Sequence, residues 1–517
     1  MTFEIVFVLL SLLGMVAALV ADKMRPGMIL FSVVVLFLCA GILTPKEMLE
    51  GFSNKGMITV ALLFLVSEGI RQSGTLGQVI KKLLPQGKTT VFKAQLRILP
   101  SVAFISAFLN NTPVVVIFAP IIKHWAKSVN LPATKFLIPL SYVTILGGIC
   151  TLIGTSTNLV VHGMILEAGF EGFSMFELGK VGIFIAIAGI IYIFLFSKRL
   201  LPDARPDTAV PDEEVEEGEK LHRVEAVLGA RFPGINKKLK DFNFQRHYGA
   251  EVKEIKTRNG QRFVSNLEDV VLHEGDTLVV MADDTFIPTW GESSVFVLLT
   301  NGNEPDTTGK KKRWFALLLL VLMIVGATVG ELPVTKEMFP DIKLDMFFFV
   351  SITTIIMAWT NLFPARKYTK YISWDILITI ACAFAISKAM VNSGVADSVA
   401  KFIIGLSDDY GPHVLLAMLF IITNLFTELI TNNAAAALAF PLALSIASQL
   451  GVSPTPFFVV ICMAASASFS TPIGYQRNLI VQGIGNYKFT DFVRIGLPLN
   501  IITFLISIIL IPLIWNF

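Results

Sequence analysis

Charged residues are scarce in this chain, because Asp, Glu, Lys and Arg together make up only 16% of its 517 residues. A soluble globular protein carries about 25% charged residues, so a water-soluble fold is excluded for most of the chain. Hydrophobic residues reach 54%, and the mean hydropathy is +0.69. Apolar stretches of about 20 residues recur, each long enough to cross a hydrocarbon core as a helix. The composition therefore predicts a polytopic membrane protein.

The chain also lacks the sequence signatures of several functional classes. Its four cysteines lie in apolar segments without paired spacing, which excludes a disulfide framework and a cysteine metal site. No Gly-x4-Gly-Lys-Ser/Thr motif is present, which disfavours transport driven by ATP. The six histidines are scattered and form no catalytic or metal-ligand pattern. We expect neither enzymatic activity, nor a metal site beyond sodium, nor a nucleic-acid partner.

Hydrophobicity falls in one central region, between Lys198 and Arg313. This region opens with an acidic, proline-containing linker and continues with short strands and tight turns, a pattern typical of a small α+β module. Lysines and arginines border the region on both sides, which marks the cytoplasmic face of a membrane protein. We predict membrane repeat 1 (1–200), a linker (201–220), a soluble insert (221–299) and membrane repeat 2 (312–517), with 201–312 in the cytoplasm.

The two membrane halves repeat one another at a nearly constant spacing. Gly154 returns as Gly474, 320 residues later, and a run of hydroxyl and amide residues over 106–112 returns over 427–433. Internal repeats with polar interruptions at matching positions are typical of transporters that bind substrate between two inverted repeats. The fold class that we predict is an all-α polytopic membrane protein of about 11 transmembrane helices, built from two inverted repeats.

Polar residues interrupt the apolar segments at four places. Asn110–Thr112 separates two apolar runs, each too short to span a membrane alone, which predicts a re-entrant helical hairpin with its tip at these residues. Thr431–Asn433 forms the matching second tip, and the segments 147–158 and 466–478 are typical of broken helices. Such breaks free backbone carbonyls for a sodium ion and helix N-termini for an anion.

A structural role is the alternative for each of these polar residues, because Asn, Ser and Thr in membrane helices often bond only to a neighbouring helix. Their clustering at two tips with one repeat spacing favours a binding role. Arg477 stands inside the second broken segment, where an ionisable residue is typical of a functional site. Its partner is either a transported anion or Glu428, or its side chain extends towards water.

The hairpin motifs Ser106–Thr112 and Thr427–Asn433 resemble those of the divalent-anion:sodium symporter family, within the broader ion-transporter superfamily. The loops Gly154–Asn158 and Gly474–Asn478 resemble the Gly/Ala-Thr-Pro-Pro-Asn-like loop that follows each hairpin in that family. The resemblance covers nearly all of both membrane halves. It implies a homodimer and an elevator mechanism, in which a mobile domain carries the site past a fixed scaffold. Compact loops and the lack of a eukaryotic-style targeting segment favour a bacterial cytoplasmic (inner) membrane.

The resemblance implies two sodium sites and an anion site between the tips. The implied sodium ligands are Ser106, Asn110, Asn111, Gly154, Thr427, Ile430, Asn432 and Gly474. The implied anion contacts are Asn111, Thr112, Thr155, Asn432, Asn433 and Tyr475, to which we add Arg477. Both tips depart from the family's Ser-Asn-Thr triad, and an aromatic and a cation replace prolines in the second loop. These changes suit a compact tetrahedral anion at least as well as a dicarboxylate. We expect sulfate first and a dicarboxylate next, with Na⁺ as the coupling ion.

The insert resembles the TrkA-C domain, the C-terminal half of regulators of potassium conductance (RCK). The resemblance rests on Phe244–Val252, followed by Leu272–Leu278. It implies a module that dimerises and binds a small regulatory ligand, sometimes a cyclic dinucleotide. Gating of transport and a purely structural role both stay open, because fold alone does not determine function.

Two rival functions remain beside sodium-coupled symport. A cation channel or exchanger gated by the TrkA-C module would need a carbonyl-rich selectivity filter, and no Thr-Val-Gly-Tyr-Gly type of element is present. A sodium-independent anion exchanger would keep the fold and change only the coupling ion.

Overall fold

The computed structural model describes most of the chain. The described residues are 3–21, 24–203, 221–229, 231–257, 261–283, 286–290, 295–300, 309–339, 342–405, 411–472 and 474–517. Residues 204–220 of the predicted linker lie outside this set.

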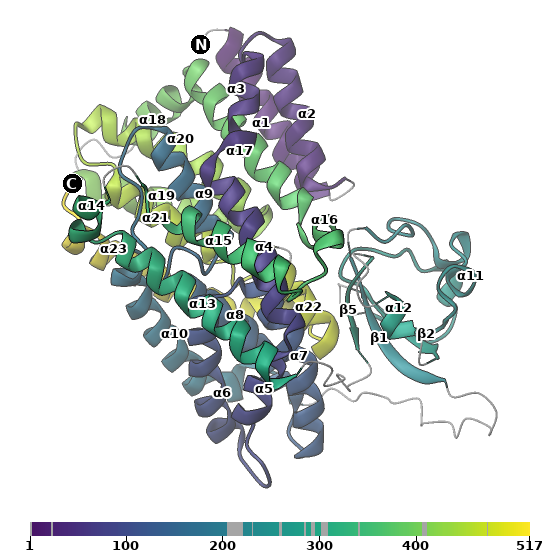
Figure 1. Cartoon of the computed structure of the whole chain (residues 1–517). Helices are drawn as coiled ribbons and strands as arrows, with labels where there is room; N and C mark the ends of the chain where they lie inside the picture. The colour runs from purple at the N-terminus through teal and green to yellow at the C-terminus, as the bar shows by residue number, and fades with distance from the viewer. Residues whose placement is uncertain are drawn as a thin grey trace.

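Helices dominate both membrane halves (Figure 1). The first half contains α1 (Phe3–Ala21), α2 (Pro26–Cys39), α3 (Pro45–Glu50), α4 (Lys55–Gln72), α5 (Thr75–Leu83), α6 (Val91–Ser106), α7 (Asn111–Ser128), α8 (Leu137–Gly148), α9 (Ser156–Glu167) and α10 (Gly179–Leu200). The second half contains α13 (Lys310–Gly330), α14 (Pro333–Met338), α15 (Met346–Trp359), α16 (Tyr368–Tyr371), α17 (Trp374–Asn392), α18 (Val395–Gly405), α19 (Gly411–Leu429), α20 (Asn432–Leu450), α21 (Thr455–Ser466), α22 (Gln476–Gly485) and α23 (Phe489–Ile514). Within the described ranges, 8 helices are long and apolar enough to cross a membrane, and shorter apolar helices accompany them. The predicted all-α polytopic fold is confirmed.

The second half repeats the element order of the first. Helices α4 and α17 both end just before a left-handed glycine, Gly74 at φ 69° and Gly394 at φ 74°. Packing between the halves is reciprocal. Helix α22 packs on α7 as α9 packs on α20, and α15 packs on α4 as α2 packs on α17. Each contact has its counterpart when the halves are exchanged, which confirms the two predicted inverted repeats.

The predicted interruptions are real breaks between helices. Helix α6 ends at Ser106 and α7 begins at Asn111, while α19 ends at Leu429 and α20 begins at Asn432. Asn110 caps α7 by accepting the Thr112 N–H at 3.5 Å, which satisfies one of the N–H groups that every helix start leaves free. The two broken segments lie between α8 and α9 and between α21 and α22.

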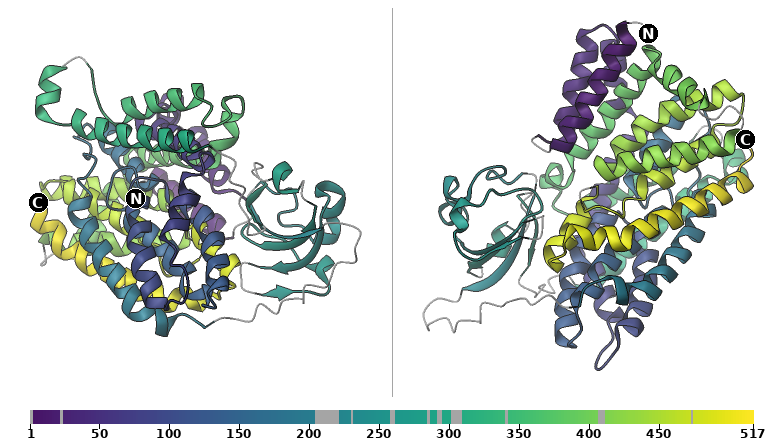
Figure 2. Two further views of the ribbon diagram at one scale, coloured as in Figure 1. Left: turned by 60° about the horizontal axis from the view of Figure 1, so that its bottom comes forward. Right: turned by 180° about the vertical axis from the view of Figure 1, so that it is seen from behind.

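The insert is a small antiparallel sheet with short helices. Its strands are β1 (His222–Leu228), β2 (Glu251–Lys256), β3 (Arg262–Phe263), β4 (Thr277–Ala282) and β5 (Phe296–Thr300), and its helices are α11 (Phe244–Tyr248) and α12 (Phe286–Trp290). The strand order is β3-β2-β4-β1-β5. A separate aromatic core, which includes Phe232, Phe242, Tyr248 and Phe296, holds the module together. Both views in Figure 2 show the insert to one side of the membrane helices, and Figure 1 shows it next to α7 and α22.

Candidate functional site

The first tip is held by a serine hydroxyl and an asparagine amide. Ser106 Oγ donates to the Thr144 carbonyl of α8 at 3.1 Å. The Asn111 amide nitrogen lies 2.9 Å from Thr144 O, 3.1 Å from Gly154 O and 2.5 Å from Ser106 Oγ, and its two hydrogens can be donated to two of these three oxygens. The Thr151 hydroxyl donates to the carbonyl of Ala107 and so ties the broken segment to the hairpin. Ser106, Asn111 and Gly154, which the family resemblance groups together, therefore lie next to one another.

Arg477 of the second repeat extends to this first tip. The Asn111 Oδ1 atom accepts from Arg477 Nη1 at 2.5 Å and from Nη2 at 3.3 Å. The opposite amide orientation would set the Asn111 nitrogen against two guanidinium donors, which is unfavourable because an amide nitrogen cannot accept. Arg477 is fully buried, and its Cζ lies 3.4 Å from the centre of the Tyr475 ring.

Glu428, the structural partner considered for Arg477, is engaged elsewhere. Its carboxylate accepts from the N–H groups of Ser470 and Thr471 and from Asn500 Nδ2, each at 2.8 Å. Within the described part of the chain, Arg477 forms no ion pair with any carboxylate. Among the described residues, the charge of this buried guanidinium is therefore not balanced by a carboxylate.

The second tip uses the same bonding scheme as the first. Thr427 Oγ1 lies 2.6 Å from Ala465 O and 2.9 Å from Asn432 Oδ1. The Thr471 hydroxyl donates to the carbonyl of Glu428 at 3.1 Å, as Thr151 does to Ala107. The Asn432 Nδ2 atom is buried and has no hydrogen-bond partner among the residues that the structure describes. This free amide end has no counterpart at the first tip.

Two glycines allow the backbone to come close to the tips. A Cβ at Gly148 would lie 2.7 Å from both the nitrogen and the oxygen of the Asn111 amide. A Cβ at Gly474 would lie 2.6 Å from the Thr427 carbonyl and even closer to Ser468 Oγ. Both distances are below any ordinary contact, so a side chain at either position would push the tip away.

The two halves touch one another between the tips. Thr155 Oγ1 and the Tyr475 hydroxyl, equivalent positions in the two repeats, lie 3.1 Å apart. The hydroxyls of Ser156 and Thr157 donate to Asn433 Oδ1, each at 3.2 Å. Together with the contact between Asn111 and Arg477, these bonds bring the first turns of α7, α9, α20 and α22 to one place. The positive dipole ends of helices favour a negative charge, so this junction is suited to an anion.

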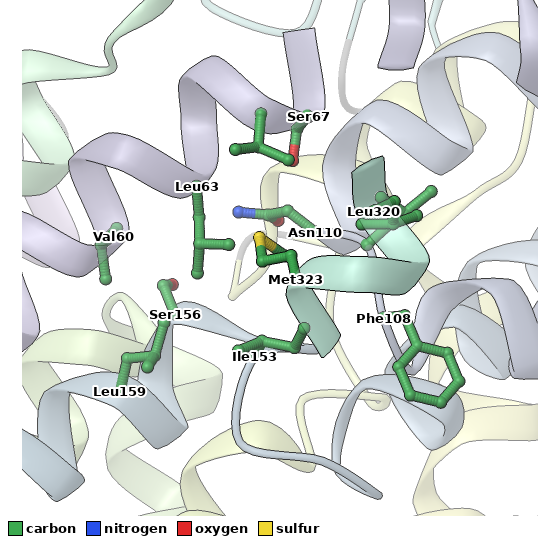
Figure 3. Close-up of a pocket in the computed structure, with 12 residues that line it drawn as sticks. Val60, Leu63, Ser67, Phe108, Asn110, Ile153, Ser156, Leu159, Leu320 and Met323 are labelled. Atoms are coloured by element: carbon green, nitrogen blue, oxygen red, sulfur yellow. The ribbon is translucent and has the colours of Figure 1, made fainter. Parts of the chain in front are cut away.

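Asn110 is the predicted sodium ligand that the structure places apart from its group. Its side chain lines a small, mostly apolar pocket between the first tip, α4 and α13, as Figure 3 shows. Ser67 and Ser156 are the other polar side chains of that pocket. Asn110 therefore caps α7 and faces the pocket, whereas the neighbouring Asn111 faces the junction.

The remaining predicted residues, Thr112 and Ile430, lie at the two tips but form no further cluster of ligand atoms within the described part of the chain. Thr112 stands in the first turn of α7, and Ile430 is buried in the turn before α20. Residues that the sequence argument passed over complete the junction: Ser141 donates to Asn478 Oδ1 at 2.6 Å, and Thr151 and Thr471 hold the two loops. Thr151 and Thr471 keep the repeat spacing of Gly154 and Gly474, and this signal would have identified them.

The comparisons match this chain to a transporter family and to several proteins named as transporters. The citrate transporter family (CitMHS) matches residues 16–447 and again residues 342–516. An uncharacterized transporter of Synechocystis, sll0640, is 30% identical over 94% of this chain and 93% of its own length. The uncharacterized transporter YfbS of Escherichia coli is 25% identical over 100% of both chains. A putative sulfur deprivation response regulator of Chlamydomonas reinhardtii is 28% identical over 93% of this chain and 96% of its own.

The fold has a counterpart among solved structures. A crystal structure of the YdaH transporter of Alcanivorax borkumensis superposes with a TM-score of 0.53, at 11% sequence identity, over 99% of this chain and 98% of that one. The likeness supports the fold of two membrane halves, and the TrkA-C resemblance of the insert stays a prediction. With two inverted repeats that meet at polar tips, and with a family match over most of its length, this chain belongs to the citrate transporter family of secondary transporters.

Proposed function

We propose that this transporter moves a small divalent anion together with sodium, with sulfate as the first candidate and a dicarboxylate as the second. The observation that carries the proposal is the fully buried guanidinium of Arg477, which lies among four helix N-termini and has no carboxylate partner in the described residues. An uncompensated buried charge costs several kcal/mol, about what a bound anion would offset. Curated relatives include sodium/sulfate cotransporters of Chlamydomonas reinhardtii and a Na(+)/citrate cotransporter of Rattus norvegicus.

The proposed sodium sites lie at the two tips. Each tip combines a hydroxyl, an amide and a glycine that allows close backbone approach, and these groups supply oxygen ligands without burying a permanent charge. The first site uses Ser106, Asn111 and Gly154, with Asn110 assigned only by the family resemblance. The second uses Thr427, Ile430, Asn432 and Gly474. The bond between Thr427 and the Ala465 carbonyl supports the second site, because it brings a further backbone oxygen to the tip.

The proposed anion site lies between the tips, at Asn111, Thr112, Thr155, Asn432, Asn433, Tyr475 and Arg477. The planar guanidinium presents parallel N–H donors that match two oxygens of one anion. The Tyr475 ring beneath the guanidinium fixes its plane. The elevator movement and the homodimer are part of the same proposal and rest on the family resemblance. A bacterial inner membrane is also part of the proposal, and the similar transporters of Synechocystis and Escherichia coli support it.

We further propose that the insert regulates transport from the cytoplasm by pressing on α7 and α22. Lys123 of α7 donates to both oxygens of Glu225 on β1, at 2.9 and 3.0 Å. On α22, a Cβ at Gly483 would lie against Thr277 Oγ1 of the insert. Asn111 and Arg477 stand near the opposite ends of these helices, about 18 Å and about 9 Å away at 1.5 Å per residue. A nucleotide-type ligand of the insert would act through these two helices.

Transport by the purified protein in liposomes tests the proposed function. Labelled sulfate and succinate are offered with and without an inward sodium gradient, to wild type and to a variant that combines Asn111→Ala with Asn432→Ala. We expect sodium-dependent uptake of one anion by wild type and its loss in the double variant. Asn392→Ala, which removes an exposed amide at the end of α17, is the matched control and should transport normally.

Three results would contradict the proposal. Equal uptake without sodium would indicate anion exchange, and cation conduction without coupling would indicate a channel. Normal transport by the double variant would remove the tips from the mechanism.

A further inference from the structure

We infer that Arg477 makes sodium binding at the first tip depend on the anion, because the guanidinium and a sodium ion compete for one oxygen atom, Asn111 Oδ1. This inference rests on the proposed sodium-coupled symport. It adds that the anion must bind before sodium at the first tip, and that sodium binding at the second tip does not depend on the anion.

The Asn111 amide has two orientations with different partners. In the orientation that satisfies both ends of the amide, its oxygen faces Arg477, and its nitrogen lies within 3.1 Å of Thr144 O, Gly154 O and Ser106 Oγ. A half-turn of the amide would place Oδ1 among those three oxygens instead. The Ser106 hydroxyl has one hydrogen, which it can donate either to that Oδ1 or to Thr144 O. Two acceptor oxygens are therefore left facing one another unless a cation lies between them, and carbonyl and hydroxyl oxygens are the ligands that replace the hydration shell of such an ion. Sodium at the first tip therefore requires the amide to leave Arg477.

Room for this half-turn exists beside the amide. Residue 148 is a glycine, and a Cβ there would lie 2.7 Å from both terminal atoms of the Asn111 side chain. Because Gly148 carries no side chain, the amide plane is not blocked on that side. The same glycine that lets the loop approach the tip thus permits both orientations.

A bound anion would release the amide. Arg477 binds a neutral amide oxygen in the structure, and its Nε has no partner among the described residues. Hydrogen bonds from a guanidinium to an anion are roughly twice as strong as bonds between neutral groups, and they are often bidentate. An anion at the junction therefore draws the guanidinium away, Asn111 Oδ1 loses its donors, and the amide becomes free to turn towards sodium.

Among the described residues, no arginine occupies the amide oxygen of the second tip. The residue equivalent to Arg477 in the first repeat is Thr157, whose hydroxyl donates to Asn433 rather than to Asn432. Asn432 Oδ1 lies beside the uncharged Thr427 hydroxyl, and its amide nitrogen has no partner in the described ranges. Sodium at the second tip therefore needs no anion, whereas sodium at the first tip does.

Binding of radioactive sodium to the purified full-length protein tests this asymmetry. We measure bound ²²Na⁺ per protomer by scintillation proximity, with and without saturating sulfate, or succinate if uptake selects it. In wild type, the anion should raise the bound sodium about twofold, which is the reciprocal coupling expected of linked sites. In Arg477→Gln the amide is no longer held, so the protein without anion should already bind as much sodium as wild type does with anion.

Arg477→Lys serves as a second variant in case Arg477→Gln does not fold. Lysine keeps the charge but lacks the two parallel donors, so this variant should bind more sodium without anion than wild type does. Lys253→Gln, an exposed change on the insert, is the matched control and should keep the wild-type response.

The outcomes separate this inference from the proposed function. An anion-induced increase of the same size in wild type and in both Arg477 variants would overturn the inference, as would wild type that binds its full sodium without anion. Absence of sodium-dependent anion uptake in wild type would instead overturn the proposed symport.

Discussion

The two hairpin tips share one framework and differ in one charge. At each tip a hydroxyl bonds to a carbonyl of the helix that follows the hairpin, as in the pairs Ser106–Thr144 and Thr427–Ala465. At the first tip the amide oxygen meets a guanidinium, whereas at the second the described residues offer the amide one partner, the threonine hydroxyl. Repeated geometry thus supplies two similar oxygen clusters, and a single arginine from the opposite repeat makes one of them responsive to an anion.

The tips also differ in how their loops are supported. Glu428 in the second hairpin fixes its loop through two backbone N–H groups, while the equivalent position in the first hairpin is Ala107, which contributes only a carbonyl. A carboxylate that accepts several backbone N–H bonds forms strong, charge-assisted contacts. The second loop is therefore built around a fixed anionic side chain, and the first loop is not.

Removal of either tip amide should have the largest effect. Asn432→Ala takes away a proposed sodium ligand, and a bond to a charged group contributes about 1.5–3 kcal/mol. The apparent sodium affinity, measured from the sodium dependence of uptake, should therefore fall roughly 10- to 150-fold. Asn111→Ala should weaken sodium as well, and it should also make sodium binding insensitive to the anion. Uptake by each single variant is measured as a function of sodium concentration, and bound sodium is measured with and without the anion. If the anion changes sodium binding equally in both variants, the proposed difference between the two tips is contradicted.

Glu428→Gln should come next in size. The glutamine oxygen can still accept from Ser470 and Asn500, but its N–H₂ group then faces the backbone N–H of Thr471. An unsatisfied buried donor costs about 1–3 kcal/mol. We expect about tenfold slower uptake and a lower melting temperature. Ala107→Ser, a small change at the equivalent position of the first hairpin, is the control. A similar loss in both variants would show that the two loops are supported alike.

Gly483→Leu and Gly163→Leu, equivalent positions in α22 and α9, should act on different neighbours. A Cβ at Gly163 would lie 2.5 Å from Asn54 Oδ1 within the membrane half, whereas one at Gly483 meets Thr277 of the insert. Overpacking costs about 1–3 kcal/mol, so Gly163→Leu should lower the melting temperature of the membrane part. Gly483→Leu should displace the insert and change the uptake rate a few-fold at unchanged sodium affinity. A shifted sodium affinity in Gly483→Leu would contradict a purely regulatory contact.

The smallest expected effect concerns pH at the contact between the insert and α7. Burial raises the pKa of Glu225, but the ammonium groups of Lys123 and Lys256 outweigh it and lower the pKa from 4.5 to about 2. A lowered carboxyl pKa stabilises the docked state at pH values above the ordinary carboxyl pKa. This contribution is lost as the pH falls towards about 2. Docking should therefore not vary between about pH 5 and about pH 8.

Limited proteolysis of the insert across this pH range checks the expectation. Glu225→Gln should raise the cleavage rate at every pH, while Glu251→Gln, on the exposed side of β2, should not. A marked pH dependence near neutrality in wild type would mean that a different group controls the contact.

Much of the candidate site was predictable because membrane helices leave few explanations for clustered polar residues. A break at bilayer depth exposes N–H and C=O groups that must find partners, so Asn111, Asn432, Gly154 and Gly474 stand out at one repeat spacing. The same reasoning grouped Asn110 with Asn111, although the structure turns their side chains to different places. Neighbouring residues at a helix start point in different directions, and sequence alone does not set which one faces the junction.

The sequence by itself determined that this protein is a membrane transporter of two inverted repeats with an inserted soluble module, because hydrophobic length, charge and an internal repeat are properties of the chain alone. Only the tertiary structure decided that Arg477 lies on Asn111 and not on Glu428, and that the insert rests on the ends of α7 and α22. These contacts join segments that are far apart in sequence, and they depend on how the repeats interlock. A side chain's partner inside a membrane protein is set by that packing, since buried donors and acceptors must be satisfied by whichever groups the fold places within reach.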